Sequence, residues 1–432
     1  MTRPTPARRA VAAAANVRTK FRNEGARGVA QRVVRRVYER VDGASLGFGL
    51  LPQDVADSTA LELRTPPPVP ASRPIEVGWL CTPPMAGSGG HTTMFRMVRA
   101  LDDAGHHNHV VLYDRHRGDL DPRAAVIHSS WPDARVTVRS IDDGLDGLDV
   151  VVATGWETAH VLASRSEAVV QRAYFIQDYE PLFYPHGTEH ALATDTYRFG
   201  FTNIALGGMV HRWLTMTGVP STRVAWGRDT HTYSLTNQEH RSGVAFFARP
   251  DTPRRGYRLG VLALAEFHRR CPEQEIHVFG ADLGDVGFPV TRHGRPTPAQ
   301  LNELYNRCAA GLALSFTNVS MVPDEMLAAG CIPVVNDSLD VRADFDNVHA
   351  EWAAPTPTAL ALGLERAVAR TSPSAVAAAA ASVAGTSWER TGRDVVGVIE
   401  ELARRAGTSP TEEGLAQAFD GRRHEPLGTA AH

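Results

Sequence analysis

Residues 75–101 read IEVGWLCTPPMAGSGGHTTMFRMVRAL and contain the strongest fold signal in the sequence. Ile75 to Cys81 is a short apolar run typical of a buried strand, and Thr92 to Leu101 has the apolar spacing of a helix. Between them, Pro83 to His91 forms a loop rich in proline and glycine. A strand, a glycine loop and a helix in this order predict the start of a Rossmann-like domain.

The same alternation runs along the chain in two blocks. In the first block, further strands are predicted at His109–Tyr113, Val136–Ile141, Val150–Thr154, Ala173–Gln177 and Thr202–Leu206. The pattern pauses over Val224–Ser234. It restarts with strands at Ser242–Ala248, Glu275–Gly280, Gly311–Ser315 and Ile332–Asn336, and with helices at Gly256–Arg270, Pro298–Cys308 and Pro323–Gly330. This predicts an α/β protein with two Rossmann-like doubly wound domains facing across a cleft.

The length supports that division, because 432 residues with 43% hydrophobic content exceed what one ordinary core needs. We assign residues 71–225 to an acceptor-side domain and residues 226–385 to a donor domain. Residues 386–405, which begin with the sequence TSWER, are predicted to form a helix that crosses back onto the first domain. Residues 406–432 lack periodicity, which predicts a disordered tail.

Residues 1–70 are predicted to be a basic extension and a proline-rich linker, with the folded part starting after Pro70. Arg18 to Arg40 has the pattern of a basic amphipathic helix. Two interpretations stay open: peripheral docking on anionic lipid at the inner face of the plasma membrane, where a lipid-linked acceptor would be anchored, or a solvated extension without a partner.

Composition excludes several classes of protein. A formal net charge of -3 argues against a broad nucleic-acid-binding face. The four cysteines are scattered, which favours a reducing compartment over a disulfide framework. No apolar run approaches the roughly 20 residues that a membrane helix needs. We therefore expect a cytoplasmic protein that acts on small molecules or glycans. Lys20 is the only lysine, so arginine would take the usual roles of lysine.

Two segments of the second block suggest a site for a diphosphate. Residues 248–256 read ARPDTPRRG and open a helix, and residues 315–335 read SFTNVSMVPDEMLAAGCIPVV. Helix N-terminal amides and guanidinium groups together bind phosphate. These segments resemble the donor domain of the retaining glycosyltransferases of family 4. The resemblance implies that Arg249, with Arg254 or Arg255, binds the diphosphate.

The same resemblance assigns further donor contacts. It implies that Glu325 accepts hydrogen bonds from the nucleotide ribose, and that amides of Asn318, Val319 and Ser320 cradle the diphosphate. Thr317 stands where the family has its first glutamate, a departure that affects contacts with the transferred sugar. For Glu325, a first-turn carboxylate favoured by the helix dipole is the structural alternative.

The acceptor side rests on the first block. Gly89 and Gly90 resemble the glycine loop that lies beneath the donor diphosphate in that family, and His91 follows them. Residues 174–185 read YFIQDYEPLFYP, which resembles the rhamnosyltransferases of bacterial S-layer glycans, a branch that uses dTDP-L-rhamnose. We expect acceptor contacts from four consecutive residues and from His91, because aromatic faces stack on sugars and carboxylates take their hydroxyls: Gln177, Asp178, Tyr179 and Glu180. A turn with core aromatics is the alternative.

The expected activity is transfer of a hexosyl group, with retention, from a nucleotide-diphosphate sugar to a glycan in cell-surface polysaccharide synthesis. Arg249 and Arg255 would stabilise the leaving diphosphate, and Asp178 would orient the acceptor or act as base. We expect no cofactor and no metal, since no Asp-x-Asp signature is suitably placed. The glycine loop lacks the spacing of an NAD-binding motif. A nucleotide-sugar epimerase of the same fold and a non-catalytic glycan-binding homologue stay as alternatives.

Overall fold

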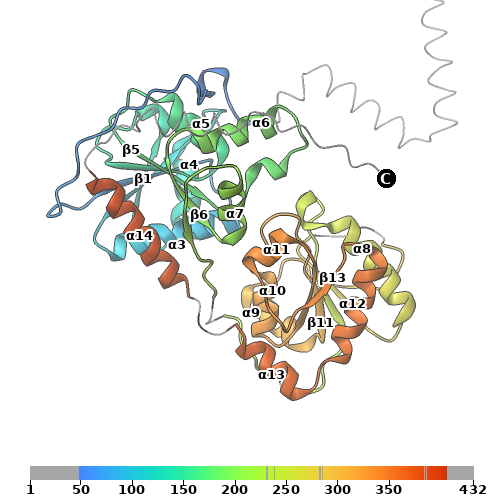
Figure 1. Cartoon of the computed structure of the whole chain (residues 1–432). Helices are drawn as coiled ribbons and strands as arrows, with labels where there is room; N and C mark the ends of the chain where they lie inside the picture. The colour runs from blue at the N-terminus through green and yellow to red at the C-terminus, as the bar shows by residue number, and fades with distance from the viewer. Residues whose placement is uncertain are drawn as a thin grey trace, which may run out of the picture. The chain divides into compact units, whose positions relative to one another are not determined.

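The structure is a computed structural model that describes residues 48–405, apart from residues 230, 231, 238, 282, 283, 285, 384 and 386. The predicted basic segment of residues 18–40 and the predicted tail of residues 406–432 lie outside the described residues. Both sheets lie within the part of the chain that follows Pro52 (Figure 1).

The first sheet has seven parallel strands in the order β3-β2-β1-β4-β5-β6-β7. Its strands are β1 (Glu76–Cys81), β2 (His107–Leu112), β3 (Val136–Ser140), β4 (Val150–Ala153), β5 (Gln171–Ile176), β6 (Thr202–Leu206) and β7 (Thr222–Val224). The order reverses between β1 and β4, as in a Rossmann sheet. Continuous apolar runs such as Val150–Ala153 are buried along their full length, because helices cover both faces of such a sheet.

Helices connect these strands. They are α3 (Gly89–Asp103), α4 (Leu120–Ser130), α5 (Trp156–Ser164), α6 (Thr188–Asp195) and α7 (Gly208–Met216), with short 3-10 turns η1 (Pro52–Asp54), η2 (Ile141–Asp143), η3 (Glu180–Phe183) and η4 (Thr196–Arg198). Helix α3 starts earlier than its apolar spacing predicts. The Ser88 side chain caps its first turn by accepting a bond from the His91 amide, so both predicted loop glycines, Gly89 and Gly90, are helical.

The second sheet has six parallel strands in the order β10-β9-β8-β11-β12-β13, and its order reverses between β8 and β11. Its strands are β8 (Val244–Phe247), β9 (Ile276–Phe279), β10 (Thr291–Arg292), β11 (Ala310–Leu312), β12 (Ile332–Asn336) and β13 (Glu351–Ala353). Its other elements are η5 (Pro253–Arg255), α8 (Tyr257–Arg270), α9 (Pro298–Arg307), α10 (Val322–Ala328), α11 (Leu339–Asp344), α12 (Pro357–Ala369) and α13 (Pro373–Ala381). Both sheets therefore have the Rossmann order, as predicted.

The last helix, α14 (Trp388–Arg404), packs on elements of the first sheet domain, alongside α3 (Figure 1). Its apolar face, with Val395 and Ile399, belongs to the core of that domain. The Trp388 ring fills the space beside Gly227, where a Cβ atom would come within 2.6 Å of the Trp388 backbone. A glycine is therefore required where the chain passes this helix.

Contacts also join α11 to α7. The Asp344 carboxylate accepts bonds from the amides of Gly208 (2.5 Å) and Met209 (3.0 Å), which satisfies free donors at the N-terminus of α7. Asp340 accepts a bond from the Trp213 indole (2.9 Å) and pairs with Arg212. Two acids of the second sheet domain thus hold one helix of the first.

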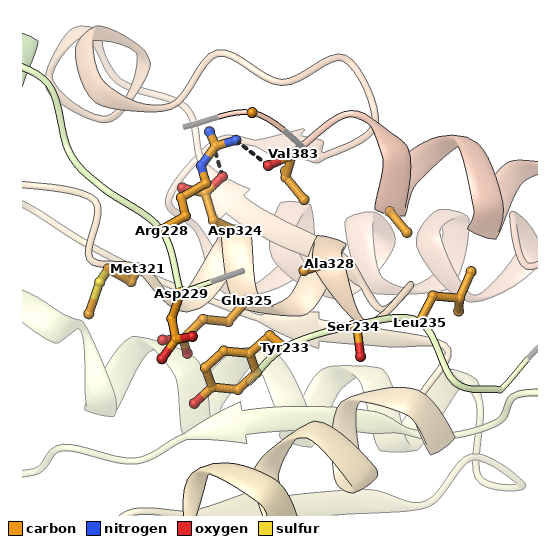
Figure 2. Close-up of a pocket in the computed structure, with 12 residues that line it drawn as sticks. Arg228, Asp229, Tyr233, Ser234, Leu235, Met321, Asp324, Glu325, Ala328 and Val383 are labelled. Atoms are coloured by element: carbon orange, nitrogen blue, oxygen red, sulfur yellow. Dashed lines mark hydrogen bonds and ion pairs between the residues drawn. The ribbon is translucent and has the colours of Figure 1, made fainter. Parts of the chain in front are cut away.

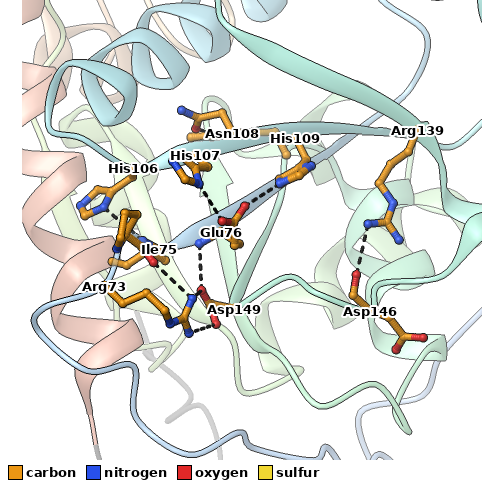
Figure 3. A network of polar contacts seen from close by, with 12 residues as sticks. Arg73, Ile75, Glu76, His106, His107, Asn108, His109, Arg139, Asp146 and Asp149 are labelled. Carbon is orange, nitrogen blue, oxygen red and sulfur yellow. Dashed lines mark hydrogen bonds and ion pairs between the residues drawn. The ribbon is translucent and has the colours of Figure 1, made fainter.

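A polar network lies where β1 and β2 begin, away from the carboxyl ends of the strands (Figure 3). Glu76 receives bonds from His107 (2.7 Å) and His109 (2.8 Å), and its amide donates to Asp149 (2.8 Å). Arg73 closes the network with two bonds to Asp149. These side chains bond to one another, so we assign the network at the amino ends of these strands a role in stabilising the fold.

The folded part starts earlier than the prediction placed it. Before the proline run, Ala56 donates its amide to His160 (3.1 Å), Ser58 bonds to Asp195 (2.6 Å), and Asp54 pairs with Arg165 (2.5 Å). The prediction was wrong because prolines exclude helix and central strand but not an ordered, extended segment. Among the described helices, none has the length and apolar character that crossing a membrane would require.

Candidate functional site

The reversal point of the second sheet carries a buried guanidinium. Arg255, at the end of η5, donates to the Ser315 hydroxyl (2.8 Å), to the Asn318 carbonyl (2.7 Å) and to the Asn318 side-chain oxygen (2.9 Å). Burial lowers the pKa of Arg255 to about 10, which leaves it charged at neutral pH. Arg255 thus fixes the shape of the loop that follows β11 through bonds that its planar fork satisfies together.

Asp178, just after β5 of the first sheet, reaches this same loop. Its carboxylate accepts bonds from the Thr317 hydroxyl (2.8 Å) and the Asn318 amide (3.3 Å), and it faces Arg254 at 3.6 Å. Burial raises the pKa of Asp178, and the two nearby guanidinium groups and its hydrogen bonds oppose that shift. Because two donors and two guanidinium groups stabilise its charged form, we take this carboxylate as ionised.

The neighbouring arginines are more accessible. Arg254 lies over the Phe183 ring at 4.1 Å, and Arg249 lies over Phe247 at 5.3 Å with its side chain exposed. Both contribute positive charge at Arg255. Three guanidinium groups and a single buried carboxylate leave an excess of positive charge at this sheet edge, which suits an anionic ligand.

The structure brings together six of the residues predicted for the site: Gln177, Asp178, Arg254, Arg255, Thr317 and Asn318. Thr317, which replaces an expected glutamate, is buried and bonded to Asp178. The Val319 side chain belongs to the core of the second sheet domain, so only its backbone can meet a ligand. Ser320 is half-buried just before α10.

Glu325 lies apart from that cluster, in a pocket of about 410 Å³ (Figure 2). The pocket is lined by Glu325 with Asp229 and Tyr233, whose polar ends lie close together, and by Met321. Glu325 makes no hydrogen bond or ion pair within the described part of the chain, whereas its neighbour Asp324 pairs with Arg228 at 3.0 Å. Burial, with Asp229 and Asp324 nearby, raises the pKa of Glu325 to about 8.

A second pocket, of about 150 Å³, lies at the reversal point of the first sheet. Three residues expected at the site line it, namely Gly90, His91 and Gln177. Gly89, the first residue of α3, is exposed, with open space where a Cβ would be. Glu157 in the first turn of α5 also lines this pocket. Sequence reasoning missed Glu157, although its place after the predicted strand Val150–Thr154 was a usable signal.

Tyr179 and Glu180 do not face a ligand. The Tyr179 ring is stacked between Tyr197 (centroids 5.3 Å apart) and Trp213 (4.9 Å), so both of its faces are covered. Glu180 is buried and accepts a 2.6 Å bond from the Trp156 amide at the start of α5. The expected acceptor contacts from these two residues are therefore replaced by core packing, because an aromatic stack and a helix N-terminus take their side chains.

The described residues contain no cluster of side chains suited to bind a metal ion. Within that part of the chain, no group of three or more His, Cys, Asp or Glu side chains is placed to hold a metal ion. The four cysteines are free, and three of them, Cys81, Cys308 and Cys331, are buried. The charged groups of the site are arginines and carboxylates.

Comparison with solved structures agrees with this architecture. HepE of Anabaena, solved in complex with UDP and glucose, superposes with a TM-score of 0.58 at 13% identity over 76% of this chain and 100% of HepE. TarM superposes with a TM-score of 0.61 at 9% identity, over 77% of this chain and 99% of TarM. The fold is GT-B. WaaG, a glycosyltransferase involved in lipopolysaccharide biosynthesis, shares this GT-B fold with a TM-score of 0.54 at 13% identity, over 75% of this chain and 99% of WaaG.

Sequence comparisons add two families and one relative. Residues 137–207 match the family "WsaF, N-terminal domain", and residues 242–365 match "WsaF, C-terminal domain". The O-antigen biosynthesis protein RfbC of Myxococcus xanthus is 32% identical over 343 residues, which is 74% of this chain and 26% of RfbC. The chain thus spans about a quarter of the length of that relative. The two WsaF-like segments of this GT-B chain contain Asp178 and Arg255, which meet at the site.

Proposed function

We propose that this protein is a glycosyltransferase that moves a hexosyl group from a nucleotide-diphosphate sugar to a glycan or lipid-linked glycan acceptor. The observation that carries the proposal is the meeting of the β5 end of the first sheet with the arginine-rich reversal point of the second sheet, through the bond between Asp178 and Thr317. A GT-B fold with an excess of positive charge at this edge suits a departing diphosphate.

The roles of the arginines differ with their burial. Arg249 and Arg254, which are exposed or half-buried, would contact the diphosphate and stabilise the charge that develops as the sugar leaves. Arg255 would keep the loop of Asn318 in shape, because its donors are already used by that loop. Amides of Asn318, Val319 and Ser320, with Gly89 and Gly90, would approach the phosphates.

Glu325 would bind the ribose of the nucleotide. It is a largely buried carboxylate without a hydrogen bond or ion pair inside the described residues, in a pocket with room for a nucleoside fragment. Ribose hydroxyls would give it the donors that the protein does not supply.

Asp178 would contribute to the reaction by positioning other groups. Its oxygens already bind the Thr317 hydroxyl and the Asn318 amide, so it would hold the diphosphate loop against the acceptor side and orient the acceptor beside it. With retention, the leaving diphosphate would take the acceptor proton on the face from which it departs.

The finer parts of the proposal rest on resemblance. We expect dTDP-L-rhamnose as the donor, because residues 174–185 resemble the S-layer rhamnosyltransferases. We also expect a role in cell-surface polysaccharide synthesis, which the name of the RfbC relative supports. We expect the protein to act in the cytoplasm. We propose that transfer needs no metal, because guanidinium groups supply the positive charge. Full activity that is lost in EDTA and restored by magnesium would contradict this.

Thermal unfolding with dTDP, UDP, GDP and ADP tests the proposal. A nucleoside diphosphate at about 100 times its Kd should stabilise the fold by roughly 2.7 kcal/mol, and the matching nucleotide-sugar should be consumed faster with an acceptor glycan than alone. No shift with any of the four would refute the proposal. Interconversion of the free nucleotide-sugar without acceptor would identify an epimerase instead.

A further inference from the structure

The small pocket at the reversal point of the first sheet is built from the loops that follow three strands. Gly90 and His91 come after β1, Thr154 and Glu157 after β4, and Gln177 after β5. In open parallel sheets, ligands bind at this point, outside the carboxyl ends of the strands. The pocket therefore has the position of a ligand-binding site, and the residues that line it determine which kind of ligand it can bind.

The Glu157 carboxylate in this lining accepts a hydrogen bond from its own backbone amide and makes no hydrogen bond or ion pair to any other described residue. Its side chain is largely buried, and burial raises the pKa of Glu157 to about 6. A largely buried carboxylate with a single donor is costly unless a ligand supplies further donors. Its position in the pocket wall lets a ligand do so.

The charge around Glu157 restricts the ligand. Glu180 lies close by, since a Cβ atom on Gly155 would be 3.5 Å from a Glu157 oxygen and 3.9 Å from both Glu180 oxygens. Two neighbouring acids repel phosphate or carboxylate groups. His91 adds no positive charge at neutral pH, because burial lowers its pKa.

Three other polar side chains of the lining already donate to backbone carbonyls of the protein. The Thr154 hydroxyl donates to the Leu80 carbonyl (2.9 Å), the Thr158 hydroxyl donates to the Gly155 carbonyl (2.8 Å), and the Gln177 amide donates to the Gly90 carbonyl (3.0 Å). The side-chain oxygens of Thr154 and Gln177 remain able to accept hydrogen bonds, whereas the Thr158 hydroxyl already accepts from the amides of Thr154 and Gly155. A fitting ligand is uncharged and donates several hydrogen bonds, which describes the hydroxyl groups of a sugar.

The pocket adjoins the arginine cluster through one residue. The Gln177 side chain lies against Gly90, while its backbone carbonyl accepts a 2.8 Å bond from the Asn318 amide group of the second sheet domain. The next residue, Asp178, faces Arg254. A sugar in the pocket would thus lie beside the place proposed for the donor diphosphate.

We propose that this pocket is the acceptor subsite, and that Glu157 accepts a hydrogen bond from a hydroxyl of the acceptor sugar and thereby positions it. This inference rests on the proposed glycosyltransferase function and adds to it the residue that selects the acceptor. Glu157 takes the role predicted for Tyr179 and Glu180, whose side chains are in the core.

Binding of methyl glycosides of rhamnose, glucose, galactose, mannose and N-acetylglucosamine, followed by saturation-transfer NMR in the presence of the nucleoside diphosphate that stabilises the protein, tests this subsite. Wild-type protein should bind at least one glycoside, and Glu157→Gln should weaken that binding roughly tenfold or more, since a bond to a charged acceptor is lost. Nucleoside diphosphate affinity should stay unchanged in Glu157→Gln, which also shows that this variant is folded.

The matched control is Glu273→Gln, which makes the same chemical change at an exposed position of the second sheet domain and should bind like wild type. Equal glycoside affinity of Glu157→Gln and wild type would overturn the subsite, and so would a wild-type protein that binds nucleoside diphosphate but none of the glycosides. Failure of the proposed function looks different, because wild-type protein would then bind no nucleoside diphosphate.

Discussion

The reversal points of the two sheets have the same topology and opposite chemistry. In the first sheet, the loops after β1 and β4 place the unpartnered carboxylate of Glu157 in a small pocket. In the second sheet, the loop after β8 places Arg254 and Arg255 beside Asp178, with Arg249 close to Arg255, and the loop after β11 supplies Thr317 and Asn318. One strand order thus presents acceptors for hydroxyl groups at one point and cations for phosphate at the other. Fold fixes where ligands bind, and local charge fixes which ligand.

The two points also differ in how far their charges are satisfied by the protein. Arg255 and Asp178 each have several polar partners, while the largely buried carboxylates of Glu157 and Glu325 make no hydrogen bond or ion pair to another residue of the described chain. Partnered buried charges hold a structure in shape, whereas unpartnered ones weaken it until a ligand binds. Removing members of each class should therefore have effects of opposite sign on stability.

The largest effect is expected for Arg255→Ala. This substitution leaves Asp178 as a buried charge with one cation fewer and removes three bonds to Ser315 and Asn318, so the free energy of unfolding should fall by about 3–5 kcal/mol. Urea denaturation measures this loss, and Arg258→Ala, at an exposed position on α8, is the control. In a cycle with Asp178→Ala, the double variant should lose less than the sum of the single variants. Strict additivity would show that the two groups are not coupled.

Arg249→Ala should separate function from stability. Its side chain is exposed, so unfolding should change by less than about 0.5 kcal/mol, while transfer should fall by about a hundredfold or more through lost stabilisation of the leaving diphosphate. Steady-state rates at saturating donor measure the loss. The exposed Arg269→Ala, on α8, provides a comparison that should keep full activity. Turnover of Arg249→Ala within twofold of wild type would remove Arg249 from the proposed mechanism.

Glu325→Gln should stabilise the protein at alkaline pH. The pKa of Glu325 is raised from its ordinary value of 4.5 to about 8 in the folded state, so the folded state holds a proton that the unfolded state has lost. Wild-type stability should therefore fall as pH rises from about 4.5 to about 8, by a few kcal/mol at most, and stay low above it. Denaturation curves of Glu325→Gln should lack this contribution. Affinity for nucleoside diphosphate should fall about tenfold, and an unchanged affinity would exclude Glu325 from the ribose site.

The smallest effect is expected for Glu157→Gln, because the pKa of Glu157 is raised less than that of Glu325. The folded-state pKa of about 6 confines the loss of wild-type stability to the window between about pH 4.5 and 6, with a size of at most about 2 kcal/mol. The difference between the denaturation curves of this variant and of wild type should level off above pH 7. A difference that grows with pH up to 9 would show that another group, such as Glu325, titrates in its place.

Much of the fold was predictable because strands and helices follow from the local spacing of apolar residues. Buried parallel strands appear as short apolar runs, so the segments predicted at residues 75–81, 150–154 and 332–336 lie within a residue or two of β1, β4 and β12. The short edge strands β7, β10 and β13, of two or three residues, went unpredicted because so few residues give no periodicity. Helix α3 begins before its apolar face does, because its start depends on the Ser88 cap.

Local sequence patterns were enough to predict the two Rossmann-like blocks, the arginine-rich loop after β8 and the polar run that follows β5. Three features became visible only in the folded chain: Asp178 bonds to Thr317, 139 residues further along, Tyr179 is covered on both faces, and Glu157 and Glu325 make no bond to another described residue. The physical reason is the distance along the sequence over which the interactions act. Strands and helices follow from spacing between near neighbours, whereas the burial and pairing of a charge depend on which distant segments pack around it.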